Sequence, residues 1–217
     1  MLIFDCNGVL VDSEPIAAAV AADEFVRIGI PITPELVTRY FFGRRAADMF
    51  ALIEAATHCK LPANFAADVA AATLKRLRAE LRAIPHASHA LTWLRGPKCV
   101  ASSSARDRIC ASLEITGLAR FFDFVFSACD VSSGKPAPHL FLHAASCMGV
   151  QALDCIVTED SPAGVTAATA AGMTAIGFVG GSHAGAQLGE ELTRAGARAI
   201  VPDLRHLKST VVAIRGW

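Results

Sequence analysis

The first short apolar segment of the chain, Leu2–Phe4, is followed by more than ninety residues before the next one, Lys98–Ala101. Further apolar segments alternate with helical patterns at Phe124–Ser127, Cys155–Val157, Thr174–Phe178 and Ala199–Val201. Short, continuously apolar strands separated by helices are typical of a parallel sheet that is buried on both faces. The pattern therefore predicts an α/β fold with a Rossmann-like parallel sheet core and helices on both of its faces.

The long segment between the first two strands exceeds what a single crossover helix needs. Its apolar pattern predicts helices over about Pro15–Ile28, Pro34–Tyr40, Ala46–Thr57 and Ala63–Leu81. Ser13 and Pro15 provide an N-cap and a first-turn proline for the first of them. We therefore predict a core domain of residues 1–14 and 83–217 and a small all-helical domain of residues 15–82, inserted after strand one.

Charge and hydropathy limit the partners of the chain. It has 20 basic and 20 acidic residues, with no basic stripe that would indicate nucleic acid and no polybasic run for an anionic membrane. No apolar run reaches the ~18 residues of a membrane span, and the N-terminus has no signal-peptide pattern. These features predict a soluble, cytoplasmic protein. As a separate expectation, the protein is a monomer or a weak dimer.

Polar residues follow the ends of several predicted strands, where open α/β sheets bind ligands. Asp5 directly follows strand one, and Gly8 allows a sharp turn behind it. Hydroxyl groups of Ser102-Ser103-Ser104 follow strand two at the start of a helix, which is a favourable place for an anion. Each feature alone has a simpler explanation, because aspartate and serine are common helix or turn caps.

Two further motifs extend this pattern. In Gly134-Lys135-Pro136-Ala137-Pro138 the prolines stiffen the loop that carries Lys135. Glu159-Asp160 follows the strand at Cys155–Val157, and adjacent acids can provide oxygen ligands for Mg²⁺. A solvated lysine and a helix cap are the simpler explanations here. Cys6 lies beside Asp5, but no histidine in the sequence marks it as an activated thiol.

Together these four motifs resemble the haloacid dehalogenase superfamily, in the subgroup with a helical cap inserted after the first motif, which includes β-phosphoglucomutase-like and phosphoglycolate phosphatase-like proteins. The resemblance covers nearly the whole chain. It rests mainly on GKPAP at residues 134–138 and DSPAGVTAATAAGM at residues 160–173, which are specific in combination.

The resemblance implies a chemistry for the first and fourth motifs. Asp5 would attack phosphorus and form an aspartyl phosphate that water then hydrolyses. Mg²⁺ would lie between Asp5, the main-chain carbonyl of Asn7 and Asp160, with Glu159 in or near its ligand shell. The cation offsets the repulsion between an anionic nucleophile and an anionic phosphate.

The other motifs would bind the substrate. The resemblance assigns phosphate oxygens to Ser102, Ser103 and the adjacent N–H groups, and charge neutralisation to Lys135. The segment around Arg44 and Arg45 matches a cap loop that faces the active site, so either arginine is a candidate contact for the far end of the substrate. A solvated surface arginine is an equally good interpretation of each.

Asn7 departs from the family pattern, because phosphatases and phosphomutases of this family have a second aspartate here that acts as general acid and base. An amide cannot exchange a proton in this way, and losing such a group typically costs ~10²–10⁴-fold in rate. Three explanations stay open: a residue introduced to trap a complex, a natural enzyme of low activity, or a different reaction. Asn7-Gly8 is also prone to deamidation, which would regenerate an acid.

The leading hypothesis is a Mg²⁺-dependent phosphatase, or a phosphomutase relative, that acts on a small phosphorylated metabolite such as a sugar phosphate. The first alternative is a protein of reduced catalytic activity that binds a phosphorylated metabolite without turning it over. The second is a hydrolase of carbon–halogen bonds. The combination of Lys135, Glu159 and Asp160 disfavours metal-free dehalogenation. Cleavage of a carbon–phosphorus bond is disfavoured because the first lysine of the chain is Lys60, so no imine-forming lysine occurs early in the insert.

Overall fold

We analysed a computed structural model of the chain, in which residues 1–216 are described apart from the side chain of Phe41. The strands are β1 (Leu2–Phe4), β2 (Lys98–Ser102), β3 (Val125–Ser127), β4 (Ile156–Glu159), β5 (Thr174–Phe178) and β6 (Ala199–Val201). They form one parallel sheet in the order β3-β2-β1-β4-β5-β6. This confirms the predicted fold class. Three strands have the predicted ends, and the ends of the other three differ by at most two residues.

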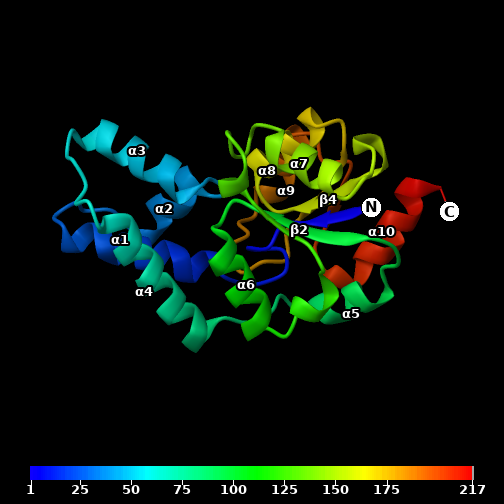
Figure 1. The fold of residues 1–217 in the computed structure, drawn as a ribbon, viewed down its shortest axis with the longest axis horizontal. Coiled ribbons are helices and arrows are strands. Elements are labelled where there is room, and N and C mark those ends of the chain that lie inside the picture. Colours follow the sequence, from blue (N-terminus) through cyan, green and yellow to red (C-terminus); the bar gives the residue numbers. More distant parts are fainter. Residues whose placement is uncertain (217) are drawn as a thin grey trace.

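Helices cover both faces of this sheet (Figure 1). One face packs on α5 (Ala87–Trp93), α6 (Arg106–Ile115) and α10 (Leu207–Arg215), and the other packs on α7 (His139–Cys147), α8 (Pro162–Ala170) and α9 (Leu188–Arg194). Successive side chains of a strand point to opposite faces. Accordingly, Leu2 and Phe4 belong to the first apolar cluster and Ile3 to the second.

Four helices follow β1 in the chain and form a separate group beside the core, at the left of Figure 1. They are α1 (Glu14–Arg27), α2 (Pro34–Phe41), α3 (Ala46–Thr57) and α4 (Phe65–Glu80). Their inner faces form a separate apolar cluster in which Phe25 and Phe65 are almost fully buried. We call α1–α4 and their loops the helical insertion. That it behaves as a cap domain bounded by residues 15 and 82 stays a prediction.

The two segments that connect the helical insertion to the core lie side by side. Val11 forms a bridge with Ala83, Asp12 N–H donates to the carbonyl of Arg82 at 2.9 Å, and Ile84 N–H donates to the carbonyl of Leu10 at 2.9 Å. The chain therefore enters and leaves the insertion at one place, next to the end of β1. No helix among residues 1–216 is long and apolar enough to cross a membrane.

Candidate active site

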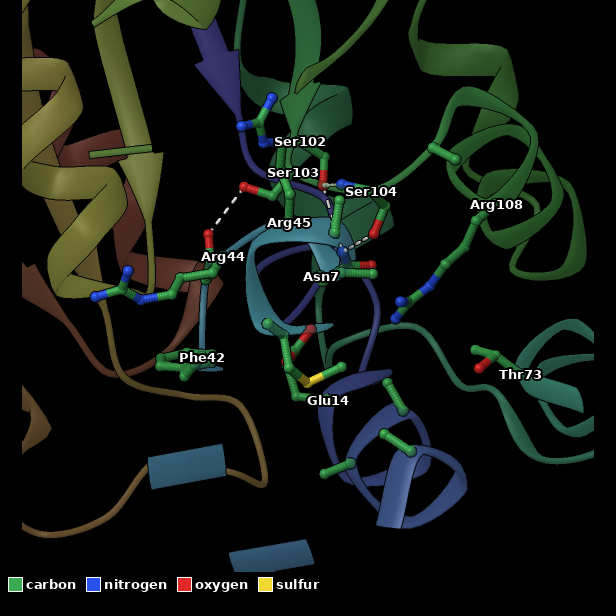
Figure 2. Close-up of a pocket in the computed structure, with 18 of the residues that line it drawn as sticks. Asn7, Glu14, Phe42, Arg44, Arg45, Thr73, Ser102, Ser103, Ser104 and Arg108 are labelled. Carbon is green, nitrogen blue, oxygen red and sulfur yellow. Dashed lines mark hydrogen bonds between the residues drawn. The ribbon is translucent and has the colours of Figure 1, made fainter. Parts of the chain in front are cut away.

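Three of the sequence motifs meet at one edge of the sheet, because they follow β2, β1 and β4, which are neighbours and run in parallel. The motif of Lys135 lies between β3 and α7, and its ammonium group reaches Asp5 at the same edge. Asp5 lies directly beyond β1, and its N–H donates to the carbonyl of Thr158 on β4 at 3.0 Å. A cavity of about 340 Å³ opens above this edge, between the core and the helical insertion (Figure 2). Core residues that line it include Asp5, Asn7, Ser102, Lys135 and Asp160.

Lys135 is the central cation of this edge and is only 3% exposed. Its ammonium group donates hydrogen bonds to Asp5 Oδ1, to Glu159 Oε1 and, at 3.3 Å, to the carbonyl of Ala101. Burial alone would lower the pKa of Lys135, but the carboxylates of Asp5 and Glu159 outweigh it and hold the pKa above its ordinary value. The lysine is therefore charged at any working pH and is fixed between two acids.

Both carboxylate oxygens of Glu159 accept hydrogen bonds from the protein. One carboxylate oxygen accepts from Lys135, and the other accepts from the N–H of Ser161 at 3.0 Å and its hydroxyl at 2.9 Å. Gly164 leaves room for this arrangement, because a Cβ atom there would lie 1.9 Å from Glu159 Cδ. These contacts favour a role in positioning Lys135, and the predicted metal contact of Glu159 stays a prediction.

Three carboxyl groups, those of Asp5, Glu159 and Asp160, are buried at this edge, and the buried ammonium group of Lys135 contacts the first two. Burial raises the pKa of Asp5 to about 7, against the opposing charge of Lys135 and with the repulsion of Glu159 adding to it. Burial, together with Glu159 and Asp5, also raises the pKa of Asp160. The site thus carries excess negative charge when all three acids are ionised, which is the electrostatic setting for a bound cation.

We expect the burial of Asp5 to make the metal-free protein less stable as pH rises from about 4 to about 7. The pKa of Asp5 rises from 3.8 in an unperturbed chain to about 7 in the folded protein. In that window the unfolded chain has released the proton that the folded protein still holds, so raising the pH favours unfolding. Chemical denaturation in a chelator, at pH values below and above the window, measures the change.

Asp5→Asn is the matched control for this measurement, because it removes one titrating carboxyl group and should reduce the pH dependence to the part that Asp160 contributes. Added Mg²⁺ should flatten it too, since a cation favours the ionised carboxylates. A stability of the metal-free protein that is constant or increases across the window would contradict this description of the site.

The surroundings of Asp160 are a second observation in favour of a metal site. Its Oδ2 atom is buried without a hydrogen-bond partner among residues 1–216, which is costly unless a cation or a water molecule occupies the space. Gly8, at a φ of +74°, faces this oxygen so closely that a Cβ atom would lie 1.7 Å away. Among the described residues no cluster of three or more His, Cys, Asp or Glu side chains is arranged to hold a metal. The expected ligand set needs only two carboxylates and a main-chain carbonyl, so the residues fit Mg²⁺.

Asn7 is held by hydrogen bonds at both ends of its amide. Nδ2 donates to Ser104 Oγ at 2.8 Å and to Ser102 Oγ at 3.3 Å, and Oδ1 accepts from Ser13 Oγ at 3.0 Å. The side chain therefore faces the serine loop after β2, where the predicted phosphate site lies. Ser102 is fully buried there, and its oxygen also lies 3.4 Å from the N–H of Ser104.

The loop at Phe42–Arg45 of the helical insertion lies over this edge of the sheet. The hydroxyl of Ser103 donates to the carbonyl of Gly43 at 2.8 Å (Figure 2). Gly43, at a φ of +75°, also approaches Ser161, where a Cβ atom would lie 2.5 Å from the hydroxyl oxygen. The Ser103 hydroxyl, predicted to bind phosphate, thus contacts the insertion in this structure, and its phosphate role stays a prediction.

Arg44 and Arg45 both line the cavity but differ in their surroundings. Arg45 forms two hydrogen bonds of 2.9 Å with the carboxylate of Asp48, and its aliphatic part packs against Gly134. Arg44 is exposed. The structure therefore brings both near the predicted site, and their contact with substrate stays a prediction.

Sequence reasoning missed two residues of this region. Arg108 lines the cavity from α6 but carries no motif that separates it from a solvated helix arginine. His183 is buried, with Nε2 3.1 Å from Asp160 Oδ2 and its ring 4.7 Å from the ring of Phe42. Its neighbour Ser182 is fixed by two hydrogen bonds to Asp12, which belongs to the first motif. The only sequence signal for His183 was a glycine-rich turn after β5.

Cys6, the alternative nucleophile, is fully buried behind Asp5. Burial, with a contribution from the Asp5 charge, raises the pKa of its thiol above the ordinary value. A thiol must lose its proton to act as a nucleophile. The surroundings therefore favour a neutral Cys6 that packs in the core.

Comparison with known proteins agrees with the fold. Residues 1–172 match the haloacid dehalogenase-like hydrolase family. The chain therefore belongs to the haloacid dehalogenase-like hydrolases.

Individual relatives match over most of their length. A 6-phosphogluconate phosphatase of Escherichia coli is 33% identical over 84% of this chain and 83% of its own. A fructose-1-phosphate phosphatase of the same organism is 31% identical over 81% of this chain and 94% of its own. A haloacid dehalogenase-like protein of Agrobacterium tumefaciens has a crystal structure that superposes with a TM-score of 0.83. It is 34% identical, and the superposition covers 99% of this chain and 98% of that protein.

Proposed function

We propose that the chain is a Mg²⁺-dependent phosphatase that transfers the phosphoryl group of a small sugar phosphate to Asp5 and then to water. We propose further that its turnover is slow because Asn7 occupies the acid–base position. The observation that carries the proposal is the buried pair of Asp5 and Lys135 at the cavity, together with the buried Asp160 oxygen that accepts no hydrogen bond. The relatives that are sugar phosphate phosphatases support the substrate class.

The carboxylate of Asp5 would be the nucleophile of the first step. One of its oxygens attacks phosphorus, the bond from phosphorus to the sugar oxygen breaks, and the sugar leaves as an alcohol once it has gained a proton. Lys135 orients Asp5 and faces the developing negative charge. Asp5, Asp160 and the carbonyl of Asn7 would hold Mg²⁺, which supplies positive charge that offsets repulsion between the nucleophile and phosphate.

Two proton transfers accompany this chemistry, and Asn7 can perform neither. The leaving sugar oxygen needs a proton in the first step, and the attacking water must lose one when the aspartyl phosphate is hydrolysed. With an amide at position 7, both protons must be exchanged with solvent. The Asn7 amide can still orient the serine loop through Ser102 and Ser104. We therefore expect phosphate binding to be retained and turnover to be reduced.

The second candidate function is binding of a phosphorylated metabolite without turnover. It is favoured by the hydrogen bonds that hold both ends of the Asn7 amide, because they make Asn7 an integral part of the site. Phosphoryl transfer between two positions of a sugar would use the same residues. Hydrolysis of a carbon–halogen bond is disfavoured by the buried acid cluster, which suits a cation.

Phosphate release from a panel of sugar phosphates, with Mg²⁺ and with a chelator, tests the proposal. We expect slow release that requires Mg²⁺ and is lost in Asp5→Asn. No release, with retained binding of the same esters, would favour the binding protein. Halide release that is insensitive to chelator would overturn both candidates.

A further inference from the structure

The guanidinium group of Arg108 is a cation of the cavity that no acid neutralises. Its Nε and Nη2 atoms are buried and have no hydrogen-bond partner among the described residues. Figure 2 shows the side chain extending from α6 toward the middle of the cavity, between Asn7 and Thr73. Buried donors without acceptors are costly, so this position suits an anion that arrives with the substrate.

The other cations of the cavity differ from Arg108 in this respect. Lys135 is bound to Asp5 and Glu159, and Arg45 is bound to Asp48. Glu14 also lines the cavity but forms no ion pair with Arg108 in the part of the chain that the structure describes. Arg108 is therefore available to a ligand without first breaking an ion pair.

Arg108 and Lys135 reach the cavity from different elements of the core. Lys135 contacts Asp5 from the loop between β3 and α7, whereas Arg108 extends from α6, and buried Thr73 lines the cavity from α4 of the helical insertion. The cavity, at about 340 Å³, has the size of a small-molecule site and exceeds the needs of phosphate alone. It has room for a substrate that reaches from Asp5 to Arg108.

We propose that Arg108 binds a second anionic group of the substrate, so that the preferred ligand is a phosphorylated sugar with a carboxylate or a second phosphate at its far end. The Nε and Nη2 donors of a guanidinium lie side by side and match two oxygens of either group. This inference rests on the proposed function, because it takes the phosphate near Asp5 as the fixed end of the ligand. Arg108 thus sets substrate choice and takes no part in the bond changes.

Binding of matched ligands to the wild-type protein tests this role. 6-Phosphogluconate and glucitol 6-phosphate differ only at carbon 1, where the first has a carboxylate and the second a hydroxymethyl group. A hexose bisphosphate adds the second phosphate, and inorganic phosphate reports on the phosphate site alone. With Mg²⁺ present, calorimetry should show that at least one of the two ligands with a second anionic group binds ~10–100-fold more tightly than glucitol 6-phosphate. Which ligand gains identifies the second group.

Substitutions on α6 locate the preference. Arg108→Gln should remove it while changing the Kd values of glucitol 6-phosphate and inorganic phosphate by less than about threefold. Arg108→Lys, which keeps the charge but loses the paired donors, should retain part of it. Arg106→Gln is the control, because Arg106 lies on the same helix and pairs with Asp130 outside the cavity.

Each contrary result has a distinct meaning. Equal binding of all esters by the wild type would overturn the role of Arg108 and leave the proposed function standing. The role of Arg108 would also be overturned if Arg108→Gln weakened the binding of every ligand to the same extent, because Arg108 would then bind the transferred phosphate. Failure of inorganic phosphate and all esters to bind would overturn the proposed function and this inference together.

Discussion

Replacing Asn7 with aspartate is expected to raise the rate of phosphate release from sugar phosphates by ~10²–10⁴-fold. The new carboxyl group would lie within hydrogen-bond distance of Ser13 and Ser104, where the amide lies now. There it could protonate the leaving sugar oxygen and then accept a proton from the attacking water. Initial rates of phosphate release with Mg²⁺, for the wild type and Asn7→Asp side by side, measure the gain.

The leaving group provides a second readout of the same substitution. The phenolate of an aryl phosphate leaves without the help of a proton. Asn7→Asp should therefore accelerate phosphoryl transfer from an aryl phosphate to Asp5 far less than transfer from a sugar phosphate. Asn64→Asp is the matched control, because Asn64 is exposed on the helical insertion and should leave the rate unchanged. An Asn7→Asp protein that gains nothing on any ester would contradict the acid–base role of position 7.

Deamidation of Asn7 could imitate the substitution, but the fold opposes it. The reaction requires the backbone nitrogen of Gly8 to attack the Asn7 side chain. In the folded protein that N–H donates to the carbonyl of Val11 at 2.7 Å, and the amide is held at both ends. We therefore expect Asn7 to persist in the folded protein, and intact-mass analysis of the wild type provides the control.

Replacing Lys135 with methionine is expected to lower the free energy of unfolding by ~3–5 kcal/mol and to reduce phosphate release by ~10²–10³-fold or more. Removing the ammonium group leaves Asp5 and Glu159 buried without their shared cation. The effect on stability follows from that unpaired charge, and the effect on rate follows from loss of the group that orients Asp5. Urea unfolding and initial rates measure the two separately.

A second substitution separates these effects. Adding Glu159→Gln to Lys135→Met removes one of the two unpaired charges, so stability should recover in part while activity stays low. Lys60→Met is the control, because the Lys60 side chain is 93% exposed and should tolerate the change. A Lys135→Met protein that is as stable and active as the wild type would show that the pair with Asp5 does not organise the site.

The fold was accessible from the sequence because its strands are short, apolar and buried on both faces. The wide gap between β1 and β2 likewise predicted the helical insertion. Asp5, Lys135 and Asp160 were found because each follows a strand or lies in a proline-stiffened loop, and parallel strands bring such positions to one edge.

The other features of the site depend on the directions of side chains, which the spacing of residues in the sequence does not determine. Glu159 and Asp160 look equivalent as neighbours in the sequence, yet Glu159 points to Lys135 and Ser161 while Asp160 faces Gly8 and His183. Successive residues at the end of a strand point to opposite sides, so adjacent acids acquire different partners. Arg108 was missed for a related reason, because its neighbours on α6 are also charged.

The central claim is that Asp5 receives the phosphoryl group, and trapping that group tests it most directly. Without a base at position 7, hydrolysis of the aspartyl phosphate should be slow enough for it to accumulate. The wild type is mixed with Mg²⁺ and an activated aryl phosphate, quenched in acid and digested, and the peptide that contains Asp5 is weighed by mass spectrometry. We predict one added phosphoryl group on Asp5 and none in the Asp5→Asn protein. A phosphoryl group on another residue, or undiminished phosphate release by Asp5→Asn, would contradict the assignment of Asp5 as the nucleophile.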